Sequence, residues 1–157
     1  DARTSLPRAN GWAAPNEKNQ CRKNPSYPKP KLDPERPQFW QAGANVNAAF
    51  GRGYRWADCM PVYTQVHTIL PPNSLLCSEK DDRRDAVSSA SSRHQGGAHV
   101  LMGDGAVKFI TDSIEAGNST AEMVWRNSPN QPGSKSPYGL WGSLGTRASK
   151  EVIDTEF

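Results

Sequence analysis

His94 and Asp104 are the two residues of this chain whose types could support proton transfer or metal binding. They lie in the segment 93–110, where nine residues separate His94 from the dipeptide Asp104-Gly105. An imidazole beside a carboxylate is the arrangement that general acid–base catalysis and many transition-metal sites use. Whether the two side chains meet depends on the elements between them.

The charged run 79–85 holds a second set of candidate ligands. Asp81, Asp82 and Asp85 could supply the carboxylate oxygens that calcium prefers. Three cationic side chains are interleaved with them and compete for the same oxygens, so a solvated charge run is the favoured interpretation. No other cofactor is expected.

Three cysteines, Cys21, Cys59 and Cys77, leave an odd thiol once one disulfide forms. In an exported protein we favour the pair Cys59–Cys77, because both residues lie in the middle of the chain, where regular elements are expected. Cys21 would then pair with another chain or with a missing part of the same protein. The alternative is three buried free thiols in a reducing compartment. No cysteine or histidine spacing indicates zinc.

A β-hairpin is expected within the segment that holds the His/Asp pair. Ala98–Met102 and Ala106–Ile110 are apolar runs, and the break Gly103–Gly105 between them is typical of a tight turn. A strand rises about 3.3 Å per residue, so the residue before the first strand and the residue at the turn are expected roughly 15–20 Å apart.

That distance makes the structural interpretation of the pair the favoured one. Asp104 and Gly105 are expected to supply the turn, where glycine tolerates a positive φ. His94 is expected to hydrogen-bond the glycine loop Gly96-Gly97 or a neighbouring segment. No catalytic residue is therefore expected, and we interpret the chain as a non-enzyme.

Other regular elements are expected to be few and short. Strands are predicted at Tyr54–Asp58 and at Val62–Leu70, the second because it is rich in β-branched residues and ends at a Pro-Pro-Asn stop. Asp112–Glu115 has the spacing of a capping box, which predicts a short helix that Gly117 ends.

Composition indicates one β-rich domain with long loops. A chain of 157 residues can bury a core, while thirteen glycines and thirteen prolines favour turns. The Pro-rich segment 1–40 is expected to be irregular, and Trp56 and Trp141 are expected to anchor the core. A net charge of +3 without a basic and aromatic cluster argues against nucleic acid. No apolar run approaches the roughly 18 residues of a membrane helix.

Several further motifs accompany the hairpin: Gly53–Asp58, Thr68–Ser74 followed by Cys77, and Tyr138–Arg147 followed by Glu151–Ile153. With residues 91–110 they resemble planctomycete-type prepilin-like proteins, a family with a domain of unknown function and a His-x(9)-Asp-Gly signature. The resemblance spans about residues 53–153. Where the family usually has His-Pro-Gly-Gly, this chain has His-Gln-Gly-Gly at 94–97.

The resemblance implies a pilin-like globular head with an antiparallel sheet, mainly β with short helices (α+β), in a single domain over 1–157 with its family-like core at 53–153. Asp1 is expected to begin partway through such a protein, after a leader and an apolar helix.

The implied function is that of a structural subunit in a cell-surface or extracellular assembly, with a periplasmic location left open. Its partners would be other copies of itself or the N-terminal half of its own precursor, with neither nucleic acid nor membrane contact from this segment. The alternative is a surface or periplasmic module that binds carbohydrate.

Overall fold

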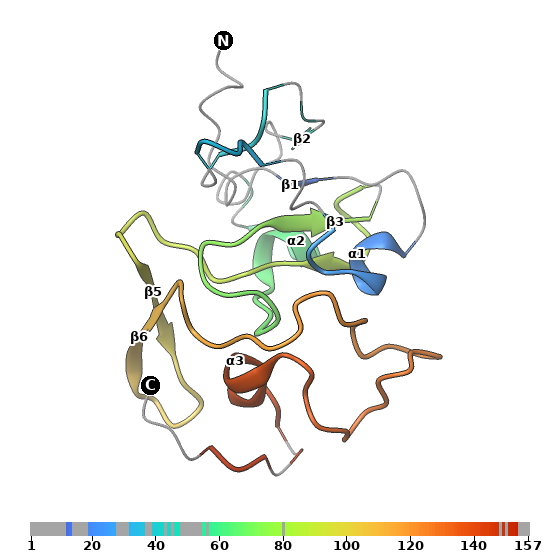
Figure 1. Ribbon diagram of the computed structural model, residues 1–157, viewed down its shortest axis with the longest axis vertical. Coiled ribbons are helices and arrows are strands. Elements are labelled where there is room, and N and C mark those ends of the chain that lie inside the picture. Colours follow the sequence, from blue (N-terminus) through green and yellow to red (C-terminus); the bar gives the residue numbers. More distant parts are fainter. Residues whose placement is uncertain are drawn as a thin grey trace.

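The computed structural model describes residues 12–13, 19–27, 32–36, 39–42, 44, 46–47, 55, 57–79, 81–147, 149 and 151–153. Over these residues the protein has an α+β fold in which short strands outnumber short helices and long loops connect them, as predicted (Figure 1). In the described part of the chain, no helix is both long enough and apolar enough to cross a membrane. Trp56 lies outside the described residues.

The larger sheet has four strands in the order β2-β1-β3-β4. β1 (Trp12–Ala13) pairs antiparallel with β2 (Val46–Asn47) and parallel with β3 (Leu76–Ser78), which pairs antiparallel with β4 (Ala86–Val87). The sheet is thus mixed, whereas an antiparallel one was expected. A parallel pair needs a long crossover, and the connection between β1 and β3 supplies it.

Two short helices lie beside this sheet (Figure 1). α1 (Gln20–Lys23) packs against β4, and α2 (Pro61–Thr64) packs against β3 and β4. α2 replaces the first half of the strand that was predicted at Val62–Leu70. Its proline occupies the first turn, where the fixed φ favours a helix start. The second predicted strand, Tyr54–Asp58, is also wrong, because its described residues form a turn.

The disulfide joins Cys21 to Cys77, with a Cα–Cα distance of 5.8 Å, so the predicted pair Cys59–Cys77 is wrong. Cys21 is fully buried where α1 meets the sheet, and Cys77 is buried in the central strand β3. Cys59 is an exposed free thiol in the loop before α2. The prediction failed because it treated the N-terminal segment as a loose covering, whereas α1 forms part of the core.

The predicted hairpin is confirmed as a separate two-stranded sheet. β5 (Gly97–Leu101) pairs antiparallel with β6 (Val107–Thr111), with Leu101 opposite Val107. Ala98 and Ile110 face each other and are buried against the body, so one face of the hairpin completes the core. The hairpin stands at one side of the molecule (Figure 1).

The helix predicted at Asp112–Glu115 does not form, and Glu115 instead stabilises the start of α3 (Gly139–Leu144). One carboxylate oxygen of Glu115 accepts a hydrogen bond from the Leu140 N–H at 2.7 Å, and its backbone carbonyl accepts one from the Trp141 N–H at 2.9 Å. The capping-box prediction is therefore wrong, because the partners of Glu115 lie in a helix 25 residues away and not in its own segment.

α3 carries the core anchor that was predicted at Trp141. This indole is 1% exposed, and its Nε1–H donates to the carbonyl of Leu70 at 2.9 Å. The main core gathers residues from α1, β3, β4 and the loops: Cys21, Trp40, Ile69, Leu70, Leu75, Cys77, Val87 and Tyr138. The loops thus contribute as much of the core as the regular elements.

Candidate functional site

The hairpin separates His94 from Asp104 as the sequence predicted. His94 precedes β5 and Asp104 lies in the turn beyond its far end, so the strand keeps the imidazole and the carboxylate apart. The carboxylate accepts a hydrogen bond from the Ala106 N–H at 2.9 Å, and Gly105 has a φ of +89°. Asp104 and Gly105 therefore form the turn, as expected.

The His94 side chain is exposed and forms no hydrogen bond with the residues that the structure describes, so the role expected of it falls to Asn73. The Asn73 amide donates to the Asp112 carboxylate at 2.8 Å and to the Gly97 carbonyl at 3.4 Å. Its carbonyl oxygen accepts from the Ser92 N–H at 2.8 Å. The sequence signal at Asn73 was the Pro-Pro-Asn stop, which indicated a turn but not these distant partners.

Gly96 and Gly97 are each required for a different structural reason. Gly96 has a φ of +84°, a conformation that residues other than glycine rarely adopt. At Gly97 a Cβ would overlap the carbonyl of Ile110 and touch the ring of Phe109, so only glycine lets the two strands approach. Within the His-x(9)-Asp-Gly segment, the glycines and Asp104 thus each meet a geometric requirement of the hairpin.

The outer face of this hairpin is apolar and exposed. Side chains alternate along a strand, so the residues between the buried ones point to solvent. Leu101 is 71% exposed, Val107 65% and Phe109 42%. His99 lies opposite Phe109 and meets its ring edge to face, with a centroid distance of 5.1 Å. An apolar outer face on a two-stranded sheet is a candidate interaction surface.

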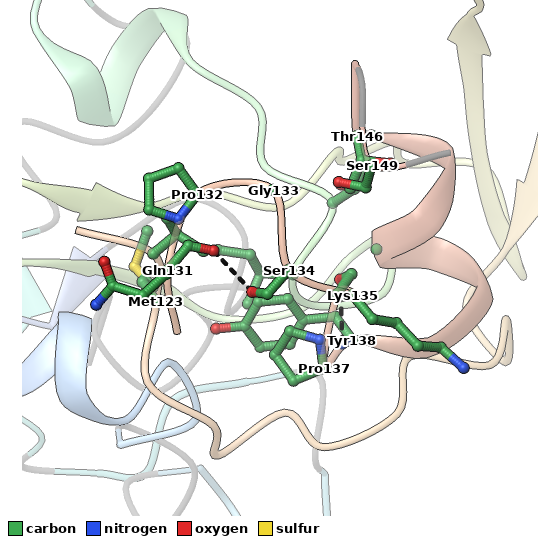
Figure 2. Close-up of a pocket in the computed structure, with 16 residues that line it drawn as sticks. Met123, Gln131, Pro132, Gly133, Ser134, Lys135, Pro137, Tyr138, Thr146 and Ser149 are labelled. Carbon is green, nitrogen blue, oxygen red and sulfur yellow. Dashed lines mark hydrogen bonds between the residues drawn. The ribbon is translucent and has the colours of Figure 1, made fainter. Parts of the chain in front are cut away.

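A hollow of about 260 Å³ is a second candidate site (Figure 2). Its wall is mostly apolar, and Figure 2 shows Pro132, Pro137 and Tyr138 around it while Lys135 directs its amino group away. The Tyr138 hydroxyl already donates to the Ala121 carbonyl at 2.9 Å, and burial, with Glu122 nearby, raises the pKa of Tyr138 to about 12. The phenol therefore serves structure and stays neutral.

A smaller hollow of about 180 Å³ shares Met123 and Val124 with the first, so the two flank one loop. Its wall holds Arg22, whose guanidinium lies 4.7 Å from the ring centroid of Trp125 and 3.1 Å from a carboxylate oxygen of Asp85. The stacked guanidinium and indole give this hollow planar polar and aromatic surfaces. Sequence reasoning missed this group, because its members come from distant segments.

The three aspartates proposed for calcium are not brought together. Asp85 pairs with Arg22, Asp82 accepts the Tyr63 hydroxyl at 3.1 Å, and Asp81 accepts a backbone N–H within its own turn. Burial and the hydrogen bond to Asp82 raise the pKa of Tyr63 to about 12. Across the residues that the structure describes, no group of three or more His, Cys, Asp or Glu side chains is placed to hold a metal ion.

Comparison with known proteins gives one result. The model of a family described as "protein of unknown function (DUF1559)" matches residues 6–117, which is more than half of the chain and includes the hairpin. The C-terminal block that begins at Tyr138 lies beyond this match. No curated protein and no solved structure matches the chain.

Proposed function

The chain belongs to the family of proteins of unknown function DUF1559, and from that premise we propose that it is the globular head of a structural, non-enzymatic subunit in a cell-surface or extracellular assembly. The observation that carries this proposal is the apolar outer face of β5–β6. Three large apolar side chains, Leu101, Val107 and Phe109, meet solvent there. Such a face on an open sheet favours association unless a partner covers it.

The finer form of the proposal is a pilin-like or pseudopilin-like subunit of the planctomycete prepilin type. His94, Asp104 and Gly105 match that family's signature, and they lie at the ends of the hairpin that carries the apolar face. The segment required by the signature is therefore the segment that presents the proposed contact. The partners would be other copies of the chain or the N-terminal half of its own precursor.

The disulfide supports export. A buried Cys21–Cys77 bond persists in an oxidising compartment and is rare in the cytosol. We therefore propose an extracellular or cell-surface location, with the periplasm as the other oxidising compartment that the bond fits.

Sedimentation velocity over a range of concentrations tests the assembly role. The wild-type chain is expected to associate as concentration rises, and Val107→Ser with Phe109→Ser, both on the outer face of β6, is expected to weaken that association. Val66→Ser is the matched control, because Val66 is 50% exposed but lies outside the hairpin. A chain that stays monomeric up to about 1 mM, which corresponds to less than about 4 kcal/mol of binding, would contradict the proposal.

The second candidate function is carbohydrate binding, and the two hollows beside Met123 and Val124 favour it. Sugar rings stack on aromatic side chains, and planar polar groups bind their hydroxyls. Trp125, Arg22 and Asp85 present such groups in one wall. Calorimetric titration with a panel of oligosaccharides is expected to give binding that Trp125→Ala removes. Absence of heat with every sugar at millimolar concentration would eliminate this function.

A further inference from the structure

We propose that two copies of the chain associate through the edge of β6, in an antiparallel pairing whose twofold axis passes through Phe109. This inference rests on the assembly role proposed above and names the contact that would serve it. The result would be a continuous four-stranded sheet with the order β5-β6-β6-β5.

The hydrogen bonding within the hairpin decides which backbone groups face outward. The Met102 N–H donates to the Ala106 carbonyl at 2.8 Å, and the Asp112 N–H donates to the Gly96 carbonyl at 2.8 Å. Bonded pairs alternate along an antiparallel ladder, so Lys108 and Ile110 bond to β5. The backbone groups of the odd-numbered β6 residues therefore point away from the hairpin.

That outer edge of β6 is open where the structure describes its surroundings. There, the Ile114 N–H on the Thr111 carbonyl, at 3.1 Å, is the one backbone hydrogen bond made to these outward groups. Among the described residues none bonds to the N–H and C=O groups of Val107 and Phe109, which therefore form a template for another strand. The opposite edge is less open, because the Asn73 amide donates to the Gly97 carbonyl at the start of β5.

A second copy of β6 fits this template in one register. With Phe109 opposite Phe109 of the second copy, Val107 falls opposite Thr111, and all three outward-facing positions meet outward-facing positions. A shift by one residue would place outward groups opposite inward ones and lose the bonds. This register makes four backbone bonds. Two join the Phe109 residues of the two copies, and one runs from each Thr111 N–H to the Val107 carbonyl of the other copy. The Thr111 carbonyl keeps its bond from the Ile114 N–H.

The side chains are compatible with this register. The two Phe109 rings would meet on the outer face, where an aromatic cross-strand pair stabilises a sheet. On the inner face Lys108 would lie opposite Ile110 rather than opposite a like charge. Its diagonal neighbours in the second copy are Asp112 and Lys108, so the charges on this face neither favour nor oppose the register. The self-complementary edge of β6 and the aromatic pair therefore favour a second copy as the occupant.

A charge-swap experiment tests whether Phe109 faces itself. Phe109→Glu alone and Phe109→Lys alone are each expected to weaken self-association about tenfold or more, since like charges would then lie directly opposite. An equimolar mixture of the two variants is expected to restore association as a heterodimer in native mass spectrometry. Leu101→Glu and Leu101→Lys are the matched controls, because Leu101 shares the outer face but would not face itself.

A spin-label distance tests the register independently of the substituted face. The Cys59→Ser chain with Gly103→Cys carries one label at the hairpin turn, where a Cβ meets no atom within 4 Å. Gly103 is level with Gly105, four residues beyond the axis, on the β5 side of each hairpin. Eight residues at about 3.3 Å along the strands and three strand spacings of about 4.8 Å across them place the two labels roughly 30 Å apart. A distance near that value, appearing as concentration rises, supports the antiparallel β6 contact.

The outcomes separate this inference from the assembly role on which it rests. Association without heterodimer rescue, or with labels closer than about 20 Å, overturns the β6 contact and leaves the assembly role standing. The β6 contact would also be overturned if mixing the two Leu101 variants restored association in the same way as mixing the two Phe109 variants. The outer faces of the two hairpins would then be packed against each other. A chain that never associates overturns both proposals.

Discussion

Removing the disulfide is expected to destabilise the protein by about 4 kcal/mol. Cys21 and Cys77 are 56 residues apart in sequence, and closing a loop of that length lowers the entropy of the unfolded chain by an amount worth roughly 4 kcal/mol at 25 °C. The matched change is the double substitution Cys21→Ala with Cys77→Ala. Both positions are fully buried, so lost sulfur contacts add to the effect.

Urea denaturation followed by tryptophan fluorescence measures this prediction. With a slope of about 2 kcal/mol per molar urea, a 4 kcal/mol loss lowers the transition midpoint by about 2 M. Cys59→Ser is the control, and it is expected to change the free energy of unfolding by less than about 0.5 kcal/mol because Cys59 is exposed and unbonded.

Two results would refute this reasoning. One is a double variant whose free energy of unfolding stays within about 1 kcal/mol of the wild type, which would mean that the bond does not constrain the unfolded chain. The other is a non-reducing proteolytic digest in which Cys77 is linked to Cys59. In that case Cys59→Ser would be the destabilising change, and the packing of α1 against the sheet would lose its covalent support.

Three further predictions concern the hairpin support and the titrating groups. Asn73→Gly keeps the positive φ of 57° but removes the amide hydrogen bonds, so chemical denaturation is expected to show a free energy of unfolding lower by about 1–3 kcal/mol. The control His94→Ala is expected to change it by less than about 0.5 kcal/mol, and equal losses would contradict the assigned roles. Backbone N–H donors hold the pKa of Glu115 below its usual value, so its contribution is complete above the unfolded pKa of about 4.5 and disappears as pH falls through the lower folded value. Glu115→Gln is therefore expected to flatten the loss of thermal stability in acid, and an unchanged acid limb would refute the cap. Tyr63 and Tyr138 have pKa values raised to about 12, so stability is expected to fall between pH 10 and 12. Absorbance at 295 nm is expected to show a late-ionising signal that Tyr63→Phe and Tyr138→Phe each reduce, and variants that leave this signal unchanged would contradict the assigned environments.

The hairpin could be predicted because its determinants are local. Two short apolar runs surround a Gly-Asp-Gly turn, and both strand formation and turn chemistry depend on a few neighbouring residues. The strand predicted at Val62–Leu70 failed because the same apolar residues satisfy a loop as well as a strand. Ile69 and Leu70 reach the core from irregular backbone, and a β-branched residue carries no mark of which route it takes.

The candidate site could be predicted only in part, because most of its support is long-range. Asp104 and Gly105 act within their own turn, so their role followed from sequence. Asn73 holds residues that lie 19 to 39 positions further along the chain, and Glu115 stabilises a helix that begins 24 residues later. No short-range pattern encodes such pairings, and the same holds for the bond between Cys21 and Cys77.

The contact between Glu115 and α3 has a consequence for biosynthesis. A helix of six residues does not persist alone, so α3 forms only when Glu115 is already placed to receive it. During translation the Leu70 carbonyl lacks its hydrogen bond from the Trp141 indole until Trp141 has left the ribosome. A purified chain that ends at residue 135 is therefore expected to be sensitive to protease around Leu70, and a chain that extends to residue 153 is expected to be protected there. The family match ends at residue 117, so the matched segment holds the acceptor while the donors that complete it lie beyond the match.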